Sequence, residues 1–599
     1  MKNLSGYLMS DKLFSLRKLL KQHNVDFYYQ ASTDEHHNEY VPHYWQRLAF
    51  ISEFTGSNGE VIIGSDTAHL WTDGRYELQS KMQLDADHWQ SSIYGEGTLD
   101  VPAWLEARAK NAICGVNPKL ISITKADVLQ KALEKNAGKL KALDEDLIDS
   151  VWQDRPAISK NKLFVLPEKL SGMSCINKIS QVRKIMQQEH ADTMFVCALD
   201  DIAWLLNIRG TDVAHTPLVL SYLLLSLDKV VLFIDKDKIS QQDLDYFVDN
   251  EIKIEAYSAI TKHLNALQGR VLLDPDTTSW WVQTQINSNQ IQLLASPIKN
   301  IKMIKNSCEQ KNVQLAHKKD AIAVIRFLCW LDKNWHTQDE ISAANKLDAI
   351  RLQDKQVMAQ DLSFPTISGF AENGAIIHYS ATPKTNKKFT DKALYLVDSG
   401  GQYLYGTTDI TRTVHFGEPT REEKYYYTLV LKGHLALGNA IFPKGTTGVQ
   451  LDTLARAPLW QQHANYNHGT GHGVGCFLGV HEGPVSISPR SKVALKVGMV
   501  LSNEPGVYFQ GKFGIRIENL CLVVPHAAES NNNFGEFYTF EDLTLVPYCK
   551  KLLLTELLSS DEVAQINQYH ENISSQIQDS LSQEEVSWLV EATSAIFSV

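Results

Sequence analysis

The spacing of apolar residues predicts a mixed α/β domain at the start of the chain. Four leucines recur at helical spacing close to the N-terminus: Leu13, Leu16, Leu19 and Leu20. Short apolar runs follow at 27–29, 61–63 and 70–71, and each has the length of a buried strand. We expect residues 1–160 to form this domain, with a polar linker near its end.

Residues 161–300 repeat the same alternation of helix and strand. A helical pattern over 175–190 leads to an apolar strand at 193–196. The most apolar stretch, 217–234, contains Asp228 and Lys229, which predicts two strands joined by a turn and not a membrane span. A second α/β domain follows, and the sequence leaves open whether it duplicates the first.

The pattern changes again from about residue 301. A long helical pattern is followed from about residue 393 by short strands and hairpins. The tail 560–597 has a helical apolar stripe around Trp588. We expect residues 301–599 to form an α+β domain with a helical C-terminal extension.

Composition and charge exclude several classes of protein. The 599 residues are 44% hydrophobic and 21% charged, as in a folded protein of several domains. The net charge of −11, without a basic stripe, excludes a general nucleic-acid partner. The first twenty residues lack the apolar core and cleavage site of an export signal, and the cysteines include no CxxC pair. We expect a cytoplasmic protein with reduced thiols and no membrane partner.

Five side chains with metal-binding chemistry are spread over the last third of the chain: Asp398, Asp409, His472, Glu504 and Glu518. Four carboxylates and one imidazole suit two divalent cations held close together. Such a pair can generate hydroxide at neutral pH and polarise a carbonyl during hydrolysis.

The two aspartates are predicted to lie on neighbouring strands. Asp398 ends a strand, and Asp409 follows eleven residues later across a hairpin. Carboxylates side by side repel each other unless a cation or a shared proton lies between them. Taken alone, the pair is equally well explained as exposed turn residues.

His472 belongs to a glycine-rich segment that begins at His468. Alternating glycines permit close backbone approach, but the phosphate-binding spacing G-x-G-x-x-G fails in every register. Two histidines four residues apart, with His481 nine residues further on, favour a catalytic cleft over a packing role.

Both glutamates lie on predicted strands. Glu504 precedes a Pro-Gly turn, and Glu518 shares a strand face with Arg516. A carboxylate on a strand flanked by isoleucines is costly to bury without a partner, which a metal or Arg516 would supply. A surface Arg516–Glu518 pair is the better explanation of these two residues alone, but not of all five together.

In this order, the residues resemble the metallopeptidase family with the pita-bread fold, which includes aminopeptidase P, prolidase, methionine aminopeptidase and creatinase. The resemblance is carried by the two aspartates, the glycine segment, and the motifs NEPG around Glu504 and RIEN around Glu518. Further segments are similar to the three-domain cytosolic Xaa-Pro aminopeptidases: 71–76, 199–212, 368–379 and 481–484. The resemblance implies two creatinase-like α/β N-terminal domains and an α+β pita-bread catalytic domain.

The resemblance also implies a cofactor and roles for the ligands. The five residues would hold two Mn²⁺ ions, with Co²⁺ or Zn²⁺ not excluded, and Asp409 and Glu518 would touch both ions. A shared water would have its pKa lowered from ~15.7 toward about 7. Glu504 would accept its proton and help to deliver it to the prolyl nitrogen.

Neighbouring residues receive roles from the same resemblance. His481 would stabilise the oxyanion, His378 would assist proton movement or contact the peptide beyond proline, and His468 would line the proline pocket. Arg516 would orient Asp409, and Tyr508 would contact the same network. The expected partners are peptides with proline at position two, and the expected assembly is a homodimer through the C-terminal domain.

Two rival functions follow from the same residues. A prolidase would cleave only dipeptides, and a catalytically inactive relative would serve as a peptide-binding module. The complete ligand set disfavours the second. In the first domain, Arg75 and Tyr76 are candidates for the rim of the cleft, but a structural role in the Asp73-Gly74 turn is equally well supported.

Overall fold

The computed structural model describes residues 9–95, 97–355, 357, 359–527 and 534–597. They form two compact units, one of Met1–Pro167 with Met173–Ile298 and one of Glu168–Gly172 with Lys299–Val599. The prediction that no export signal is present rests partly on residues 1–8, which lie outside the described part.

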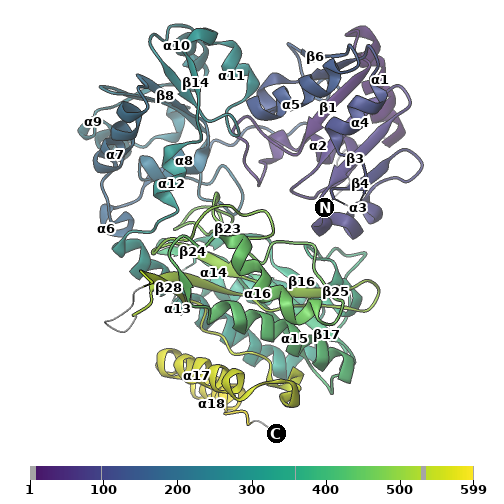
Figure 1. Cartoon of the computed structure of the whole chain (residues 1–599), viewed down its shortest axis with the longest axis vertical. Helices are drawn as coiled ribbons and strands as arrows, with labels where there is room; N and C mark the ends of the chain where they lie inside the picture. Colours follow the sequence, from purple (N-terminus) through teal and green to yellow (C-terminus); the bar gives the residue numbers. More distant parts are fainter. Residues whose placement is uncertain (1–8, 96, 356, 358, 528–533, 598–599) are drawn as a thin grey trace. The chain divides into compact units, whose positions relative to one another are not determined.

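A six-stranded sheet forms the centre of the first predicted domain (Figure 1). In spatial order its strands are β4 (Gln90–Ile93), β3 (Ala68–Thr72), β2 (Glu60–Gly64), β1 (Phe27–Ala31), β5 (Ile113–Val116) and β6 (Lys139–Ala142). The accompanying helices are α1 (Met9–Gln22), α2 (Arg47–Ser52), α3 (Glu77–Gln83), α4 (Val101–Arg108) and α5 (Ile123–Glu134). The leucines of α1 are buried except for Leu19, which is half-buried, so the predicted amphipathic helix is confirmed.

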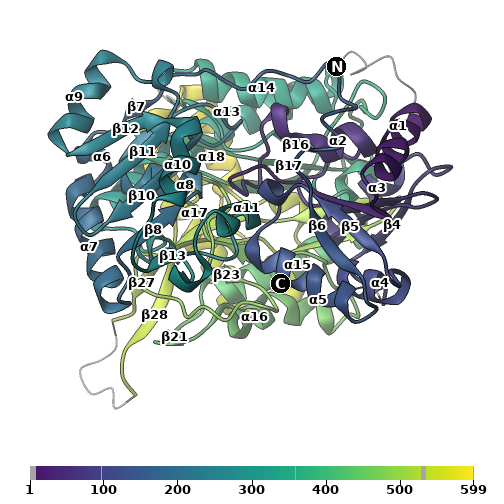
Figure 2. The ribbon, with the colours of Figure 1, turned by 90° about the horizontal axis from the view of Figure 1, so that it is seen from above.

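The second predicted domain has a sheet of the same topology. Its strands in spatial order are β12 (Ile252–Ala256), β11 (Val230–Ile234), β10 (Ser221–Ser226), β8 (Thr193–Val196), β13 (Val271–Leu273) and β14 (Ile291–Leu293), several of which run side by side in Figure 2. In both sheets the first strand pairs antiparallel with the second and parallel with the fifth. The shared order and directions support the interpretation that one domain duplicates the other.

Two local predictions in the second domain are confirmed. The apolar stretch 217–234 forms the antiparallel pair β10 and β11, with the turn at Asp228 and Lys229. The helical pattern at 175–190 forms α7 (Cys175–Gln188). The remaining elements of this domain are α8 (Leu199–Leu205), α9 (Gln241–Asp249), α10 (Ile260–Asn265), α11 (Trp280–Thr284) and the small pair β7 (Phe164–Val165) and β9 (Ile208–Arg209).

The second unit is an α+β domain, as expected. Its helices are α6 (Glu168–Ser171), α13 (Ser307–Asn334), α14 (Glu340–Gln353), α15 (Arg421–Gly438), α16 (Gly448–Trp460), α17 (Ser560–Ile577) and α18 (Gln583–Thr593), and α12 (Pro297–Lys302) spans the border of the units. Helices α15 and α16 lie side by side, as do α17 and α18 (Figure 1).

The described strands of this unit form five small sheets. They are β15 (Asp361–Leu362), β18 (Gly401–Tyr403) and β19 (Gly406–Thr407); β16 (Ile367–Phe370), β17 (Leu394–Ser399) and β20 (Ile410–His415); β21 (Phe442–Pro443), β28 (Phe537–Asp542), β27 (Asn519–Pro525) and β24 (Val500–Asn503); β22 (Gly471–His472) and β23 (Ser486–Ile487); and β25 (Gly506–Phe509) and β26 (Phe513–Arg516). Every residue of β17 is buried.

The C-terminal helices belong to the core of this unit. Leu589 and Ile596 are buried in the same apolar cluster as residues of α13, and Trp588 packs against that cluster. The apolar stripe of the tail is therefore used within the chain. This packing leaves the stripe with no need for a second subunit to cover it.

Two general expectations can be compared with the described residues. All eight cysteines lie in the described part of the chain and are free thiols. Among the described helices, none combines the length and the apolar composition needed to cross a bilayer. The domain borders at 160 and 300 stay predictions.

A buried ion pair gives a test of the packing of α13 against α14. The Arg351 guanidinium donates to both carboxylate oxygens of Asp320, at 2.8 and 3.1 Å, and the Tyr403 hydroxyl donates to Asp320 at 2.8 Å. We predict that Arg351→Met destabilises this unit by about 3–5 kcal/mol, because it leaves a buried carboxylate without its cation. The measurement is the shift of the urea-unfolding transition.

The exposed pair Lys512–Glu422 is the matched control for this prediction. Lys512→Met should cost no more than about 1 kcal/mol, because water screens an exposed pair. Equal shifts of the unfolding transition for both variants would show that the buried pair contributes no more to the stability of the fold than the exposed pair.

Candidate metal centre

Strand register places the two aspartates on one face of a sheet. Asp398 on β17 lies directly opposite Thr411 on β20. Asp409 precedes Thr411 by two residues, so the side chains of Asp409 and Thr411 point to the same face. The prediction that the hairpin brings both carboxylates together is confirmed, and because both residues are buried, the alternative of exposed turn residues is wrong.

The two glutamates reach the same site from short connections between strands, and not from within strands as we predicted. Glu518 lies between β26 and β27, where its amide donates to the Thr411 carbonyl at 3.1 Å. The Thr411 hydroxyl donates to Glu518 Oε2 at 2.8 Å. Glu504 lies between β24 and β25, and its amide donates to the Thr470 carbonyl at 2.8 Å. Thr411 and Thr470 thus fix the backbone of both glutamates.

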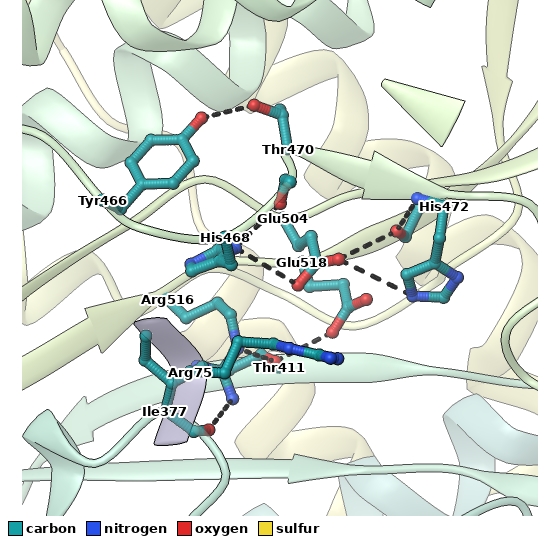
Figure 3. A network of polar contacts seen from close by, with 12 residues as sticks. Arg75, Ile377, Thr411, Tyr466, His468, Thr470, His472, Glu504, Arg516 and Glu518 are labelled. Atoms are coloured by element: carbon teal, nitrogen blue, oxygen red, sulfur yellow. Dashed lines mark hydrogen bonds and ion pairs between the residues drawn. The ribbon is translucent and has the colours of Figure 1, made fainter. Parts of the chain in front are cut away.

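His472 faces the carboxylates from β22 (Figure 3). Its Nε2 atom lies 3.5 Å from Asp409 Oδ2 and 3.6 Å from Glu504 Oε1. Its Nδ1 atom donates to the Gly473 carbonyl at 3.0 Å, which fixes the ring and leaves Nε2 for a ligand. Asp409, His472 and Glu518 each offer a ligand atom within 4.8 Å of the others.

The carboxylate oxygens of the site fit bound cations. Among the five predicted ligands, all of which are described, three buried oxygens have no hydrogen-bond partner: Asp398 Oδ1, Asp409 Oδ1 and Glu518 Oε1. Unpaired buried carboxylate oxygens are costly, and a metal ion is the partner that several of them can share. The donor set of four carboxylates and one imidazole therefore fits hard divalent cations.

Burial and mutual repulsion raise the pKa of two of the predicted ligands. Burial, followed by the charge of Asp398, raises the pKa of Asp409 well above its ordinary value. Burial, followed by the charge of Asp409, raises the pKa of Glu518 in the same way. Without cations, the site thus disfavours having all of its carboxylates ionised.

Arg516 binds a different aspartate from the one that we predicted. Its Nη2 atom donates to Asp398 Oδ2 at 2.6 Å and its Nε atom to the Thr411 hydroxyl at 3.0 Å. A role of Arg516 in orienting Asp409 therefore stays a prediction. Asp398 lies opposite Thr411, the residue that Arg516 also binds, whereas Asp409 lies two residues before Thr411 in the chain. The alternative of a surface Arg516–Glu518 pair is wrong, because both residues are buried.

Tyr508 connects Arg516 with His468. Arg516 Nη1 donates to the Tyr508 hydroxyl at 2.7 Å, and that hydroxyl lies 2.9 Å from His468 Nε2. His468 Nδ1 lies 2.8 Å from the Gly469 carbonyl and 3.9 Å from Glu504 Oε2. Burial raises the pKa of Tyr508 to about 12, so the hydroxyl stays protonated and donates to His468. His468 and His472 flank Glu504 from opposite sides (Figure 3).

The other two predicted histidines lie beside these residues. The rings of His481 and His472 meet edge to face, with centroids 4.3 Å apart. His378 is half-buried and follows Ile377, whose carbonyl accepts from Arg516 Nη2 at 3.4 Å (Figure 3). His481 thus contacts a predicted metal ligand, whereas His378 follows a residue that binds Arg516, the arginine that holds Asp398.

The glycines next to His472 are required by close backbone contacts. A Cβ atom on Gly471 would lie 1.9 Å from the Ser502 carbonyl oxygen, and one on Gly473 would lie 2.2 Å from the Glu482 carbonyl oxygen. The interpretation that the glycines permit close backbone approach is confirmed.

Two supporting residues were missing from the sequence-based site. Thr411 binds Glu518 and Arg516 and lies opposite Asp398 in the paired strands. Strand alternation from Asp409 would have identified it. Ser502 donates to Glu504 Oε1 at 3.2 Å and accepts from the His472 amide at 2.9 Å. Ser502 has no such signal, because the contact between β22 and β24 cannot be read from residue spacing.

In the first unit, Arg75 and Tyr76 serve the turn in which they lie. The Arg75 guanidinium forms two hydrogen bonds with the carboxylate of Asp73, at 2.9 and 2.8 Å. Tyr76 is buried, and its hydroxyl lies 2.7 Å from that of Ser57. These contacts support the structural role, and a role at the cleft rim stays a prediction.

Family models match four successive stretches of the chain. Residues 12–151 and 154–309 each match a Creatinase/Prolidase N-terminal domain. Residues 311–525 match metallopeptidase family M24, and residues 536–596 match the C-terminal region of peptidase M24. The third stretch contains all five predicted metal ligands.

Relatives resemble the chain over nearly its whole length. A "Probable Xaa-Pro aminopeptidase P" of Laccaria bicolor is 41% identical over 94% of this chain and 89% of the relative. An "Aminopeptidase P1" of Lotus japonicus is 37% identical over 98% of this chain and 100% of the relative.

Solved structures agree with these relatives. X-prolyl aminopeptidase from Caenorhabditis elegans, described as a cytosolic enzyme with a di-nuclear active site, matches with a TM-score of 0.94 and 34% identity over 98% of this chain and 100% of its own. Xaa-Pro dipeptidase from Bacillus anthracis shares the fold over 63% of this chain and 99% of its own, with a TM-score of 0.52 and 23% identity. The chain belongs to metallopeptidase family M24, in its group of Xaa-Pro aminopeptidases.

Proposed function

We propose that this chain is a dinuclear-metal aminopeptidase that releases the first residue from peptides with proline at the second position. One observation carries the proposal. Asp398, Asp409 and Glu518 direct buried oxygens that lack a hydrogen-bond partner among the described residues toward the site that His472 faces. The names of the relatives and the di-nuclear site of the C. elegans enzyme support the substrate and the metal count.

The residues that would hold the two ions are Asp398, Asp409, His472, Glu504 and Glu518. We propose Mn²⁺, because oxygen donors outnumber nitrogen here, and Co²⁺ or Zn²⁺ would also bind such a set. Bound cations supply a water of lowered pKa and a Lewis acid for the scissile carbonyl.

Glu504 is the proposed proton carrier. Its side chain is 18% exposed, which is more than the other three carboxylates of the site. Its two oxygens face different histidines, Oε1 toward His472 and Oε2 toward His468. A partly exposed carboxylate between the ligands and the substrate side is well placed to accept a proton from water and to pass it to the prolyl nitrogen.

The proline specificity follows from the shape and rigidity of the substrate. An Xaa-Pro bond has no N–H to bind, and the proline ring fixes its own dihedral. His468 is held by the Tyr508 hydroxyl and the Gly469 carbonyl, so its ring presents a fixed surface. We propose that this ring lines the proline pocket.

The remaining histidines are proposed to act on the peptide. His481, which lies against His472, would donate to the oxyanion as charge develops on the carbonyl. His378 would assist proton movement or contact the peptide beyond proline. Arg516 and Tyr508 would hold Asp398 and His468 in position, and their buried contacts make them positioning residues.

The proposed oligomeric state rests on the family resemblance, and the proposed cellular location rests on one relative. We propose a homodimer through the C-terminal domain and a cytoplasmic location, the latter by analogy with the cytosolic C. elegans enzyme. The expected soluble partners are peptides.

One prediction of the proposed function concerns Glu504. We expect Glu504→Ala to lower kcat for release of arginine from Arg-Pro-Pro with Mn²⁺ by about 10²–10⁴-fold, because the variant removes a general base and a metal ligand. Glu422→Gln, on the exposed start of α15, should retain the full rate. A fully active Glu504→Ala variant would contradict the mechanism.

The same assay separates the main rival. The aminopeptidase should release the first residue from Arg-Pro-Pro, whereas a prolidase would cleave Arg-Pro and leave the tripeptide intact. Cleavage of the dipeptide alone would replace the proposal with the prolidase.

Another prediction concerns the protons that the carboxyl groups release when metal binds. In the metal-free protein the pKa of Asp409 and that of Glu518 are raised, so the folded state holds protons that an unfolded chain would lose. The contribution of these two carboxyl groups to the stability of the metal-free fold is thus present at low pH, and it is lost as the pH rises through their raised pKa values. Cations reverse this, because they favour the ionised carboxylates.

We therefore expect Mn²⁺ binding to release protons and to become tighter as the pH rises. Isothermal titration calorimetry in buffers of different ionisation enthalpy measures the number released. Proton uptake, or an affinity that is independent of pH, would contradict the description of these carboxyl groups.

A further inference from the structure

We propose that Glu340 is a positioning residue that holds the segment 371–387 against the metal centre and thereby fixes the reach of His378 toward the peptide. The inference rests on the proposed function of His378. It adds a residue that lies outside the metal ligands and on a different element, α14.

Glu340 is the first residue of α14 and is fully buried. The helix start is already capped without it. Asp339 accepts a hydrogen bond from the Ser342 amide at 2.8 Å, and the Ser342 hydroxyl accepts one from the Asp339 amide at 2.9 Å. This reciprocal cap satisfies the helix terminus, so the buried carboxylate of Glu340 must have another use.

Its carboxylate gathers four donors from the segment that carries His378. Oε1 accepts from the Phe370 amide at 2.7 Å and from Asn373 Nδ2 at 2.9 Å. Oε2 accepts from the Tyr379 hydroxyl at 2.9 Å and from the Lys387 amide at 2.9 Å. One side chain thus binds the start, the middle and the end of the segment.

The backbone of Glu340 strengthens the same connection. Its amide donates to the Lys387 carbonyl at 3.1 Å, and its carbonyl accepts from the Ser368 hydroxyl at 2.7 Å. All four donors to the carboxylate are neutral. Burial raises the pKa of Glu340, and the four hydrogen bonds oppose that change. Such a costly group is retained where it organises its surroundings.

The segment needs this organisation because it contains little regular structure. Among its described residues, the only helical element is a 3₁₀ turn at Ala371–Ala375, and no strand is present. Ala371 has a φ of 54°, a left-handed conformation that is unfavourable for a residue with a Cβ atom. Such a conformation persists only where the surrounding contacts fix it.

The segment in turn lies on the strand that carries Arg516. A Cβ atom on Gly514 of β26 would lie 1.8 Å from the Gly374 carbonyl oxygen, so the two backbones are in direct contact. Ile377 accepts a hydrogen bond from Arg516, which also binds Asp398. His378 lies between this contact and Tyr379, one of the residues that Glu340 holds. A shift of the segment would therefore move His378 relative to the metal ligands.

The test is a double-mutant cycle on kcat/KM for Arg-Pro-Pro. Glu340→Gln preserves the shape but turns an NH₂ group toward the Tyr379 hydroxyl and the Lys387 amide, which are both donors. We expect a fall of about 10- to 100-fold, because misplacement of a group at the reacting centre by about 1 Å has an effect of that order. Mn²⁺ stoichiometry should not change.

The decisive comparison is made in the His378→Ala background. If Glu340 acts through His378, Glu340→Gln should lower kcat/KM there by less than about twofold, because residues of one network are not additive. Equal losses in both backgrounds would overturn the proposal, and so would a His378→Ala variant with the full rate.

Two further variants make the result independent of folding. Glu309→Gln, at the start of α13, is the matched control, because Glu309 is also a buried glutamate in a helix cap and should leave kcat/KM unchanged. Tyr379→Phe removes one hydroxyl and should repeat the cycle on a smaller scale if Glu340→Gln does not fold. Failure of the proposed function would be seen differently, as an active Glu504→Ala variant, whereas failure of this inference leaves an active wild-type enzyme with an additive cycle.

Discussion

Repulsion between carboxylates that are buried together is the constraint on which the C-terminal unit depends. Asp398, Asp409 and Glu518 each keep a buried oxygen for which the described residues provide no hydrogen bond. Three such oxygens gathered in one place would lower the stability of the fold unless they had a shared partner. Divalent cations would meet that need, and the same cations would supply the chemistry of peptide hydrolysis. The stability of the site and its activity would then have one cause.

The surroundings of the ligands are built to tolerate this charge and to keep it in place. Arg516 neutralises Asp398 from one side, and Thr411 binds Arg516 and Glu518 together. On the other side of the strand, Arg412 donates to the carbonyls of Glu518 and Val546, both at 2.6 Å. Arg412 thus joins the C-terminal segment to the backbone of a proposed metal ligand, so this segment also supports the site.

The sequence predicted which side chains gather at this site because their signals are local. Strand alternation, an eleven-residue spacing and glycines at close backbone contacts can each be read from a few neighbouring residues. The identity of the helices and most strands followed in the same way from apolar periodicity. Partners across distant strands were harder. The hydrogen bond of Arg516 to Asp398, the position of Ser502 and the four contacts of Glu340 depend on pairings between segments far apart in the chain, for which periodicity gives no signal. The five small sheets were missed for the same reason.

The central claim is that five residues of one unit hold two cations. Anomalous diffraction at the manganese absorption edge, from crystals grown with Mn²⁺, tests it most directly. The account predicts two peaks, both in contact with Asp409 and Glu518, one of them also in contact with His472. A single peak, or peaks that contact none of the five ligands, would contradict it.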